Sequence, residues 1–254
     1  MDAVILAAGR GSRLGDITAQ SPKPMTLLAG KPLFDWQCES LRQAGVDQIS
    51  VVTGYGANAF DNFSGVRFHN PRWENSNMVE SLRQAEHVLT QSSHIISYGD
   101  IAYQPDIVRE LMASSSDIAI SCDLDWYALW SERFDDPLSD AETFEQVDGR
   151  LVAIGERSND LGKIQGQYMG LLKITSTGWA LISSFLKALT DEQIYRLDMT
   201  SLLQGLICSG VGISVVNVKG GWVEVDTPAD LRLYERAIRT TGWHHDWRFS
   251  KMER

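Results

Sequence analysis

The chain has 254 residues, of which 43% are hydrophobic, and this size predicts one large α/β domain over residues 1–254 with a C-terminal tail over residues 240–254. Its 33 acidic residues outnumber 23 basic ones, for a net charge of −10. This balance argues against nucleic acid or an anionic membrane as a partner, since either needs a basic face. The three cysteines are too far apart for a disulfide framework or a zinc site and indicate a reducing compartment.

The first predicted element is a buried strand over residues 4–6, followed by a loop of very small residues. Ala7, Ala8, Gly9 and Gly11 let a ligand approach the main chain closely and accept hydrogen bonds from its N–H groups. Positive charge surrounds the same loop, on Arg10, Arg13 and Lys23. In an acidic chain, this clustering of cations indicates an anionic ligand such as a phosphate.

Two common glycine loops do not fit this segment. The dinucleotide-binding fingerprint G-x-G-x-x-G requires glycine where Leu14 stands, and the glycine comes one place late, at Gly15. The phosphate loop G-x-x-x-x-G-K-[ST] would end at Lys31, but it would then begin at Met25 and carry Pro32 in place of the hydroxyl residue. The spacing excludes both classes.

The segment from Leu6 to Leu14, together with Pro22-Lys23-Pro24, resembles the opening of the nucleotidyltransferase (pyrophosphorylase-like) superfamily, L-A-A-G-x-G-x-R-L and a proline-flanked lysine. The resemblance implies a three-layer, Rossmann-like (GT-A-like) fold with a mixed, mainly parallel sheet and helices on both faces. It also implies that Arg13 contacts the phosphates of a nucleoside triphosphate and that Lys23 stabilises charge in the transition state. It assigns nucleotide binding to Leu6, Ala7, Ala8, Gly9, Arg10, Gly11 and Ser12.

The next segments alternate between helix and strand. Residues 34–44 have the pattern of a helix that ends at Gly45, and residues 48–53 that of a strand ending at Gly54. This βαβ order predicts parallel strands. Ligands bind beyond the carboxyl ends of such strands, which is where the opening loop would lie.

The polar turn Asn75-Ser76-Asn77 precedes the next predicted helix. Asn77 is expected to cap this helix, with Glu80 completing a capping box. The turn is explained either by a capped core helix or by hydrogen bonds to a nucleobase edge. It resembles the choline-phosphate cytidylyltransferase branch of the superfamily, and the resemblance implies that Ser76 and Asn77 help to recognise cytosine, so that CTP is the favoured donor.

Two later strands each deliver carboxylates at their ends. Residues 94–98 lead to Gly99 and Asp100, and residues 221–225 contain Glu224 and lead to Asp226. Asp226 alone could be only a helix cap. The resemblance implies that Gly99 contacts the nucleotide and that Asp100 and Asp226 together hold Mg²⁺, which prefers such oxygen ligands.

The middle of the chain is rich in tryptophan and acidic residues. Carboxylates and indole faces suit a cationic acceptor, such as phosphocholine, an aminoalkylphosphonate or a phosphorylated amino acid. Two plainer interpretations stay open, because a four-residue spacing also suits a helix core and exposed acids are often only solvated. A hydroxyalkyl phosphonate or a polyol phosphate also stays open. The residues expected to bind the acceptor are Trp126, Trp130, Asp140, Glu142, Gln167, Tyr168 and Glu224.

These features predict a Mg²⁺-dependent cytidylyltransferase that transfers CMP from CTP to a small phosphate or phosphonate and releases pyrophosphate. An ionised acceptor needs no general base, so the histidines are expected to be structural or, for His244 and His245, to lie in a polar tail. The alternatives are a sugar-1-phosphate nucleotidyltransferase, whose glutamate-lysine pair is only approximated by Glu156-Arg157, and a regulatory domain that binds nucleotide without chemistry.

We expect the rest of the chain to have a structural role. Residues 178–189 and 199–208 predict helices, residues 213–218 a strand, and Asp148-Gly149 the turn of a hairpin. The aromatic tail is expected to dock on the body or on a second copy in a homodimer. The first strand follows Met1-Asp2 directly and no apolar segment is long enough to span a membrane, so a cytoplasmic location is expected.

Overall fold

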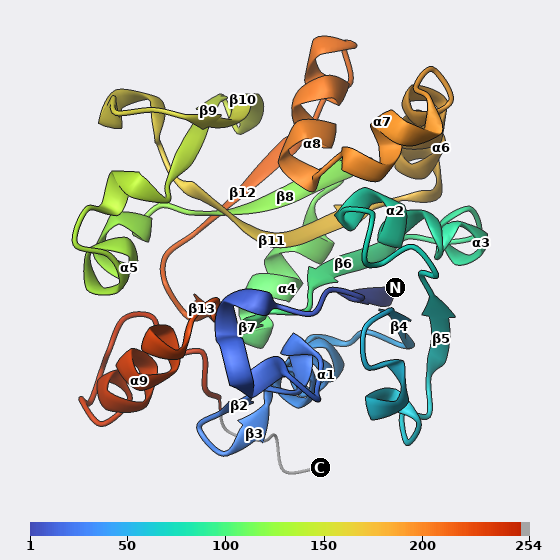
Figure 1. The fold of residues 1–254 in the computed structure, drawn as a ribbon. Helices are drawn as coiled ribbons and strands as arrows, with labels where there is room; N and C mark the ends of the chain where they lie inside the picture. The colour runs from blue at the N-terminus through green and yellow to red at the C-terminus, as the bar shows by residue number, and fades with distance from the viewer. Residues whose placement is uncertain (250–254) are drawn as a thin grey trace.

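The computed structural model describes residues 1–249, and residues 250–254 of the predicted tail lie outside the described residues. Within residues 1–249, nine strands form one sheet in the order β5-β4-β1-β6-β11-β8-β12-β10-β9 (Figure 1). Their bounds are β1 (Asp2–Ala7), β4 (Ile49–Thr53), β5 (Val66–His69), β6 (His94–Tyr98), β8 (Ile118–Asp123), β9 (Glu142–Val147), β10 (Arg150–Arg157), β11 (Gln167–Ile174) and β12 (Ser214–Val218). Two short ribbons pair β2 (Leu27–Leu28) with β3 (Lys31–Pro32) and β7 (Ile101–Tyr103) with β13 (Trp222–Glu224).

The sheet is mixed, as expected, and its parallel part is concentrated in the first half of the chain. Strands β5, β4, β1 and β6 run parallel, and β12 runs parallel to β8. Strand β11 is antiparallel to both β6 and β8, and the hairpin β9-β10 pairs antiparallel with the rest. The carboxyl ends of β1 and β6 therefore meet at one edge, as a ligand site on a parallel sheet requires.

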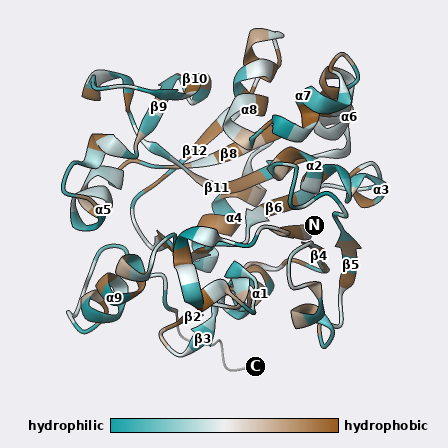
Figure 2. Cartoon of the chain, viewed as in Figure 1, coloured by the Kyte–Doolittle hydropathy of each residue, from teal (hydrophilic) through white to brown (hydrophobic). Residues whose placement is uncertain are grey.

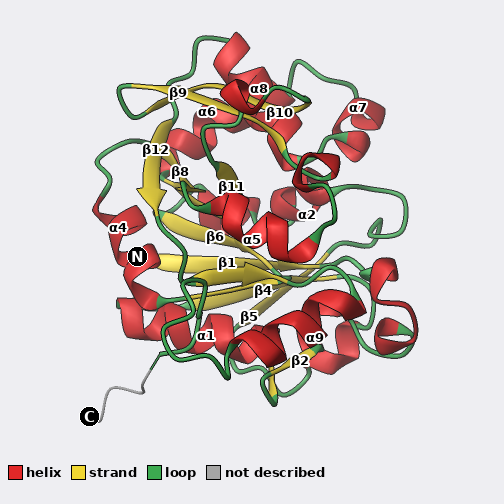
Figure 3. Ribbon diagram, turned by 90° about the vertical axis from the view of Figure 1, so that its left-hand side faces the viewer, coloured by secondary structure: helices red, strands yellow, loops and turns green. Residues whose placement is uncertain are grey.

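Helices cover both faces of this sheet (Figure 3). Their bounds are α1 (Leu33–Ala44), α2 (Met78–Arg83), α3 (Glu86–Leu89), α4 (Pro105–Ala113), α5 (Trp126–Arg133), α6 (Ser176–Leu186), α7 (Asp191–Arg196), α8 (Met199–Cys208) and α9 (Pro228–Ala237). Successive residues of β1 point to opposite faces, so Ile5 joins the core under α1 and α4 while Val4 joins the core under α2, α6 and α8. Apolar residues accordingly concentrate in the central strands (Figure 2). The predicted three-layer α/β architecture is confirmed.

Local sequence signals located several elements well. Helix α1 begins one residue before its predicted start and ends at Gly45, whose φ of 93° is the left-handed conformation of a glycine cap. Helix α8 has its predicted bounds, and the hairpin turn has φ of 51° at Asp148 and 72° at Gly149, as a type I′ turn requires. Helix α6 starts two residues earlier and ends three residues earlier than predicted, and α7 was not predicted.

Only one of the two hydrogen bonds of the predicted capping box before α2 has its predicted residue as partner: the cap at Asn77 is present, and the bond from Glu80 is not. Asn77 is the N-cap, and its side chain accepts a hydrogen bond from the N–H of Met78 at 2.8 Å. The Glu80 carboxylate does not complete the box, because it is buried and contacts Arg83 at 2.9 Å and Gln84 at 2.8 Å instead. The pairing with side chains on the same helix outcompetes the bond back to the cap.

The tail packs on the body of the molecule as far as residue 249. The Trp247 side chain is fully buried, and its ring lies 6.2 Å from the rings of Trp36 and Tyr234. His245 is also buried, so the prediction that it lies in a polar tail is wrong. The aromatic side chains of the tail, Trp243, Trp247 and Phe249, hold the segment against Trp36 of α1 and Tyr234 of α9, one of the two docking modes expected from the sequence. Among residues 1–249, none of the helices combines the length and apolar character that a membrane crossing requires.

Helix α9 follows directly on Asp226, and a capping box holds its start. Thr227 Oγ1 accepts from the N–H of Asp230 at 3.3 Å, and Asp230 Oδ2 accepts from the N–H of Thr227 at 2.8 Å. We expect Thr227→Ala to lower the free energy of unfolding by about 1 kcal/mol, measured by urea titration. The exposed Thr241→Ala is the matched control, and equal losses in both variants would contradict a role for the cap.

Candidate active site

Three carboxylates from distant parts of the chain meet at the end of the sheet. One oxygen from each of Asp100, Glu224 and Asp226 lies within 4.8 Å of the other two. The ribbon of β7 and β13 brings them together, because Glu224 pairs with Ile101 and the N–H of Val225 donates to the carbonyl of Asp100 at 2.9 Å. The predicted pair Asp100 and Asp226 is therefore adjacent, and Glu224 joins it.

The Lys23 side chain lies between two of these carboxylates. Its Nζ is 2.7 Å from Asp100 Oδ2 and 2.5 Å from Asp226 Oδ1. Burial acts to lower the pKa of Lys23, but the charges of Asp100, Asp226 and Glu224 outweigh burial and raise that pKa above its usual range. Lys23 therefore stays protonated at neutral pH and supplies positive charge, which excludes a role as a general base.

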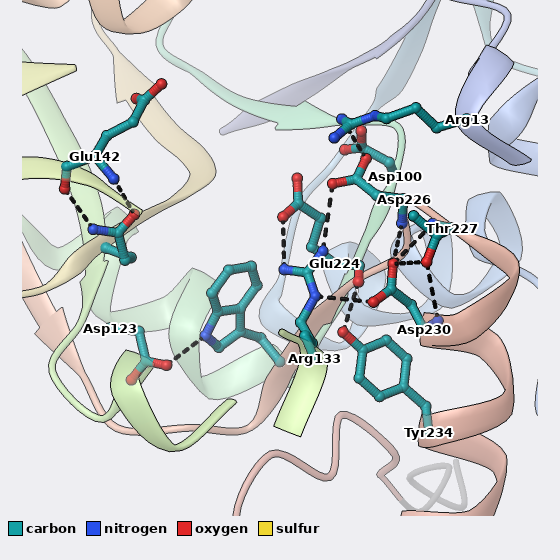
Figure 4. A network of polar contacts seen from close by, with 12 residues as sticks. Arg13, Asp100, Asp123, Arg133, Glu142, Glu224, Asp226, Thr227, Asp230 and Tyr234 are labelled. Atoms are coloured by element: carbon teal, nitrogen blue, oxygen red, sulfur yellow. Dashed lines mark hydrogen bonds and ion pairs between the residues drawn. The ribbon is translucent and has the colours of Figure 1, made fainter. Parts of the chain in front are cut away.

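Arg13 approaches the same cluster from the opening loop. Its Nη2 lies 2.8 Å from Asp226 Oδ1, while 64% of its side chain is exposed (Figure 4). Burial acts to raise the pKa of Asp226, but Lys23, Arg13 and Arg133 outweigh it and hold that pKa below its usual range. Asp226 is therefore ionised at neutral pH, and the exposed Arg13 is able to turn toward a ligand.

The donor set suits a hard divalent cation. Mg²⁺ prefers carboxylate oxygens, and the cluster offers three carboxylates. Asp100 Oδ1 is buried and has no hydrogen-bond partner, so this oxygen is available as a ligand. Burial and the charge of Asp226 raise the pKa of Glu224 to about 8, although Arg133 opposes them. Glu224, which sequence reasoning assigned to the acceptor, also lies in the cluster with Asp100 and Asp226 that would hold a metal.

A cavity of about 200 Å³ lies on one side of the cluster, beneath the opening loop. Most residues expected to bind nucleotide line it, together with Lys23 and Asp100. Arg10 and Ser12 do not line it; the Arg10 guanidinium instead lies 5.6 Å from the ring of Tyr55. The expected residues that line this cavity are Leu6, Ala7, Ala8, Gly9, Gly11, Ser76, Asn77 and Gly99.

The polar turn before α2 forms one wall of this nucleotide-side cavity. Asn70 is buried and its Nδ2 donates to Ser76 Oγ at 3.1 Å and to Ser81 Oγ at 3.0 Å. Asn77 both caps α2 and lines the cavity, so the interpretation as a helix cap and the interpretation as a ligand-binding turn are compatible. Trp73 also lines the cavity, and nothing in the periodicity of the sequence had identified it.

A second cavity of about 270 Å³ lies on the other side of the cluster and shares Met78 and Tyr98 with the first. Arg13, Glu224 and Asp226 are among its lining residues. Two further charged residues line it: Asp198, which was not predicted, and Arg157, which was considered only as part of the approximate glutamate-lysine pair of a sugar-1-phosphate nucleotidyltransferase. The residues expected to bind the acceptor that do line this cavity are Trp130, Asp140, Glu142, Gln167, Tyr168 and Glu224.

The tryptophans of α5 do not form an open aromatic wall. Trp126 is 4% exposed, packs against Trp130 at 6.0 Å between ring centroids, and lines neither cavity. Trp130 reaches the second cavity, but the Arg133 guanidinium lies 5.0 Å from its ring centroid. The four-residue spacing therefore reflects packing on one helix face, and the expectation that Trp126 contacts an acceptor is wrong because its ring is enclosed in the core.

Arg133 is a charged residue of this region that sequence reasoning missed. Its side chain has no exposed surface and contacts Glu224 at 3.1 Å, Asp226 at 3.4 Å and Asp230 at 3.0 Å (Figure 4). The available signal was a single arginine three residues after Trp130 in a block otherwise rich in acid, which places it on the same face of the helix as that tryptophan.

One glycine of the opening loop is fitted closely to Lys23. Gly11 has φ of 73°, and a Cβ at this position would lie 2.7 Å from Lys23 Cβ. We expect Gly11→Ala to displace the lysine and to lower kcat by about 10²-fold, as small misplacements of catalytic groups do. Gly30→Ala is the control, because φ is 77° there and no atom lies within 4 Å of the added Cβ. Similar kcat values in the two variants would contradict this prediction.

Comparison with known proteins identifies the family. The model of the MobA-like NTP transferase domain matches residues 3–182. The chain therefore belongs to the MobA-like NTP transferase family, which confirms the resemblance to nucleotidyltransferases.

Three of the similar proteins are named for a cytidine nucleotide. The chain is 34% identical over 249 residues to a CTP:phosphoglutamine cytidylyltransferase from Campylobacter jejuni, with 92% of this chain and 98% of the relative covered. It is 27% identical over 248 residues to a CMP-5'-(3-aminopropyl)phosphonate synthase from Streptomyces rubellomurinus, covering 91% of this chain and 37% of that longer protein. The solved inositol-1-phosphate CTP transferase from T. maritima has the same fold, with a TM-score of 0.72, 21% identity, and 92% and 95% of the two chains covered.

Proposed function

We propose that this chain is a Mg²⁺-dependent cytidylyltransferase that transfers CMP from CTP to a small amine-bearing phosphate or phosphonate. The observation that carries the proposal is the meeting of two cavities at one cluster of carboxylates, Asp100, Glu224 and Asp226, with Lys23 between them. The nucleotide-side cavity would hold the triphosphate, and the second cavity would hold the acceptor. A domain that only bound nucleotide would not require the second cavity or the lysine.

CTP is the proposed donor because both sequence relatives described above, which match more than nine tenths of this chain, are named for the use or the product of a cytidine nucleotide. The wall formed by Ser76 and Asn77 supports this choice, since hydroxyl and amide groups can both donate to and accept from a base edge. We further propose that residues 1–254 act as one domain in the cytoplasm, without nucleic acid as a partner.

In the proposed reaction, an oxygen of the acceptor's phosphate or phosphonate attacks the α-phosphorus of CTP. The bond between the α-phosphorus and the oxygen bridging to the β-phosphate breaks, and pyrophosphate leaves. Neither cavity is lined by a histidine of the described chain, and none is needed because the acceptor oxygen is already ionised. Lys23 provides a fixed positive charge at the junction of the cavities, and Arg13 a mobile one.

The residues that would hold Mg²⁺ are Asp100, Glu224 and Asp226. Mg²⁺, when bound there, would neutralise charge on the triphosphate and on the leaving pyrophosphate. These carboxylates lie where the two cavities meet, so a metal held there would bring the triphosphate close to the acceptor.

The acceptor cavity favours a primary ammonium group. Asp140, Glu142 and Asp198 line it and can accept hydrogen bonds from such a group, whereas a quaternary ammonium has no N–H to donate. A quaternary acceptor would depend on aromatic faces. The tryptophans of α5 do not supply them, because Trp126 is in the core and Arg133 lies against Trp130, so the remaining aromatic lining is Tyr98, Phe144 and Tyr168. Arg157 supplies a cation on the same wall, which suits the carboxylate of a phosphorylated amino acid.

The proposal is tested by measuring pyrophosphate release with Mg²⁺, each of the common nucleoside triphosphates and a panel of acceptors. The panel comprises phosphorylated glutamine, 2-aminoethylphosphonate, phosphoethanolamine, phosphocholine, glycerol phosphate and hexose 1-phosphates. We expect turnover with CTP and the primary amines. Turnover only with hexose phosphates would contradict the proposed acceptor class, and no turnover with any donor would favour a regulatory domain.

A further inference from the structure

We propose that Arg133 is a positioning residue that holds Glu224 and Asp226 in the arrangement that binds the metal, an inference that rests on the proposed function. The three nitrogens of its guanidinium each contact a different carboxylate. Nη1 lies 3.1 Å from Glu224 Oε2, Nη2 lies 3.4 Å from Asp226 Oδ2, and Nε lies 3.0 Å from Asp230 Oδ1. The planar guanidinium spreads its donors over three nitrogens and so reaches three separate acceptors, whereas a lysine carries all its donors on one nitrogen and cannot keep this spacing.

Arg133 is fixed in place and cannot reach a substrate. Its side chain has no exposed surface, and it lines neither cavity. The rings of Trp130 and Phe134 each lie 5.0 Å from its guanidinium carbon, which adds cation–π attraction to the ion pairs. Any effect of Arg133 on the reaction must therefore pass through the side chains that it contacts.

Asp230 connects Arg133 to the backbone of the metal-binding segment. Its Oδ1 accepts from Arg133, while its Oδ2 accepts from the N–H of Asp226 at 3.0 Å and from the N–H of Thr227 at 2.8 Å. Arg133 thus holds the Asp226 side chain directly and the Asp226 backbone through Asp230 (Figure 4). The start of α9 and the end of α5 are joined by this network.

The cations near the site contact different oxygens of the Asp226 carboxylate. Lys23 and Arg13 contact Oδ1, whereas Arg133 contacts Oδ2 from the opposite side. Lys23 and Arg13 line cavities and are able to respond to a nucleotide, but Arg133 is enclosed. Arg133 therefore stays paired with Glu224 and Asp226 and offsets the electrostatic repulsion between their carboxylates.

A simpler role, in which Arg133 only neutralises charge, predicts the opposite result. If charge alone mattered, removing a cation beside the site would strengthen the binding of a divalent metal, and a lysine would replace the arginine fully. If the fork positions the ligands, loss of the fork weakens metal binding even when the positive charge is kept. The sign of the change in metal affinity distinguishes the two roles.

The test is the binding of Mn²⁺ alone, followed by electron paramagnetic resonance of the free ion, in the native full chain and in Arg133→Lys and Arg133→Met. We expect both variants to bind Mn²⁺ about tenfold more weakly or worse, the usual effect of losing a residue that orients metal ligands. Native affinity in Arg133→Lys, or equal or tighter binding in Arg133→Met, would overturn the proposal. Pyrophosphate release by the native chain is measured separately, so that failure of the proposed function is recognised independently.

Two further variants keep the test decisive. In a Glu224→Gln background, the effect of Arg133→Lys on Mn²⁺ affinity should become smaller, because only the contacts with Asp226 and Asp230 remain; an undiminished effect would contradict a role through Glu224. If the Arg133 variants do not fold, Phe134→Leu removes one ring that fixes the guanidinium while it keeps every charged side chain of the network, so that only the orientation of the guanidinium is loosened. Weaker Mn²⁺ binding by folded Phe134→Leu supports the proposal, and native affinity in it overturns the proposal.

Discussion

Lys23→Met is expected to lower kcat by about 10³-fold, comparable to the loss of a key charge-stabilising group in other transferase and hydrolase sites. The reason is its position: the Lys23 ammonium lies between Asp100 and Asp226 at the junction of the two cavities, and it stays protonated. We expect the effect to fall on kcat more than on KM for CTP, because the lysine acts on charge that develops during transfer. Pyrophosphate release under saturating CTP measures it.

Lys31→Met is the matched control for this variant. Lys31 also forms an ion pair, with Glu39 at 2.6 Å, and lies over the ring of Trp36, but it lines neither cavity. It should retain nearly native kcat. A Lys23→Met enzyme that turns over as fast as Lys31→Met would remove Lys23 from the mechanism.

Asp226→Asn is expected to abolish Mn²⁺ binding and to lower kcat by about 10³-fold or more, because it removes a charged ligand from the carboxylate cluster. The change keeps the size of the side chain, and Thr227 rather than Asp226 caps α9, so the helix should remain. Circular dichroism and thermal unfolding report the fold, and Mn²⁺ titration reports the site. The effect should not be rescued by raising the CTP concentration.

Asp123→Asn is the control for removing a buried carboxylate. Asp123 is fully buried and accepts from Trp222 Nε1 at 2.8 Å and from the N–H of Gly220 at 3.0 Å, but it lines neither cavity. We expect it to lose stability and to keep metal binding. If Asp123→Asn lost Mn²⁺ as completely as Asp226→Asn, the loss would reflect a general loosening of the fold and not a ligand.

The sequence predicted the half of the site that depends on local pattern. The opening loop, Lys23, Asp100 and Asp226 each stand where a strand ends or where a short motif fixes the chain, so their neighbourhood follows from the order of elements. The same applies to α1 and α8, whose apolar spacing and terminal signals gave their bounds within one residue.

Six of the seven residues predicted to bind the acceptor line the second cavity, but the charged residues that distant segments bring to this region were not predicted. Arg133 meets its three partners across more than 90 residues, and Asp198 enters the second cavity as the cap of α8. Trp126 was predicted to contact a ligand and lies in the core instead, because a helical spacing of aromatic residues is typical of a core face as well as of a ligand-binding wall. Burial decides between them, and burial is set by the packing of α5 on α9 and the tail.

The most direct test of the whole account is ³¹P nuclear magnetic resonance of CTP, Mg²⁺ and an amine-bearing acceptor with the native chain. We predict that the signals of CTP and the acceptor decline together, while pyrophosphate and one new CMP-linked product rise in equal amounts. Conversion of CTP to CMP and pyrophosphate with the acceptor unchanged would contradict transfer between the two cavities. Unchanged CTP with every acceptor of the panel would contradict the proposed enzyme itself.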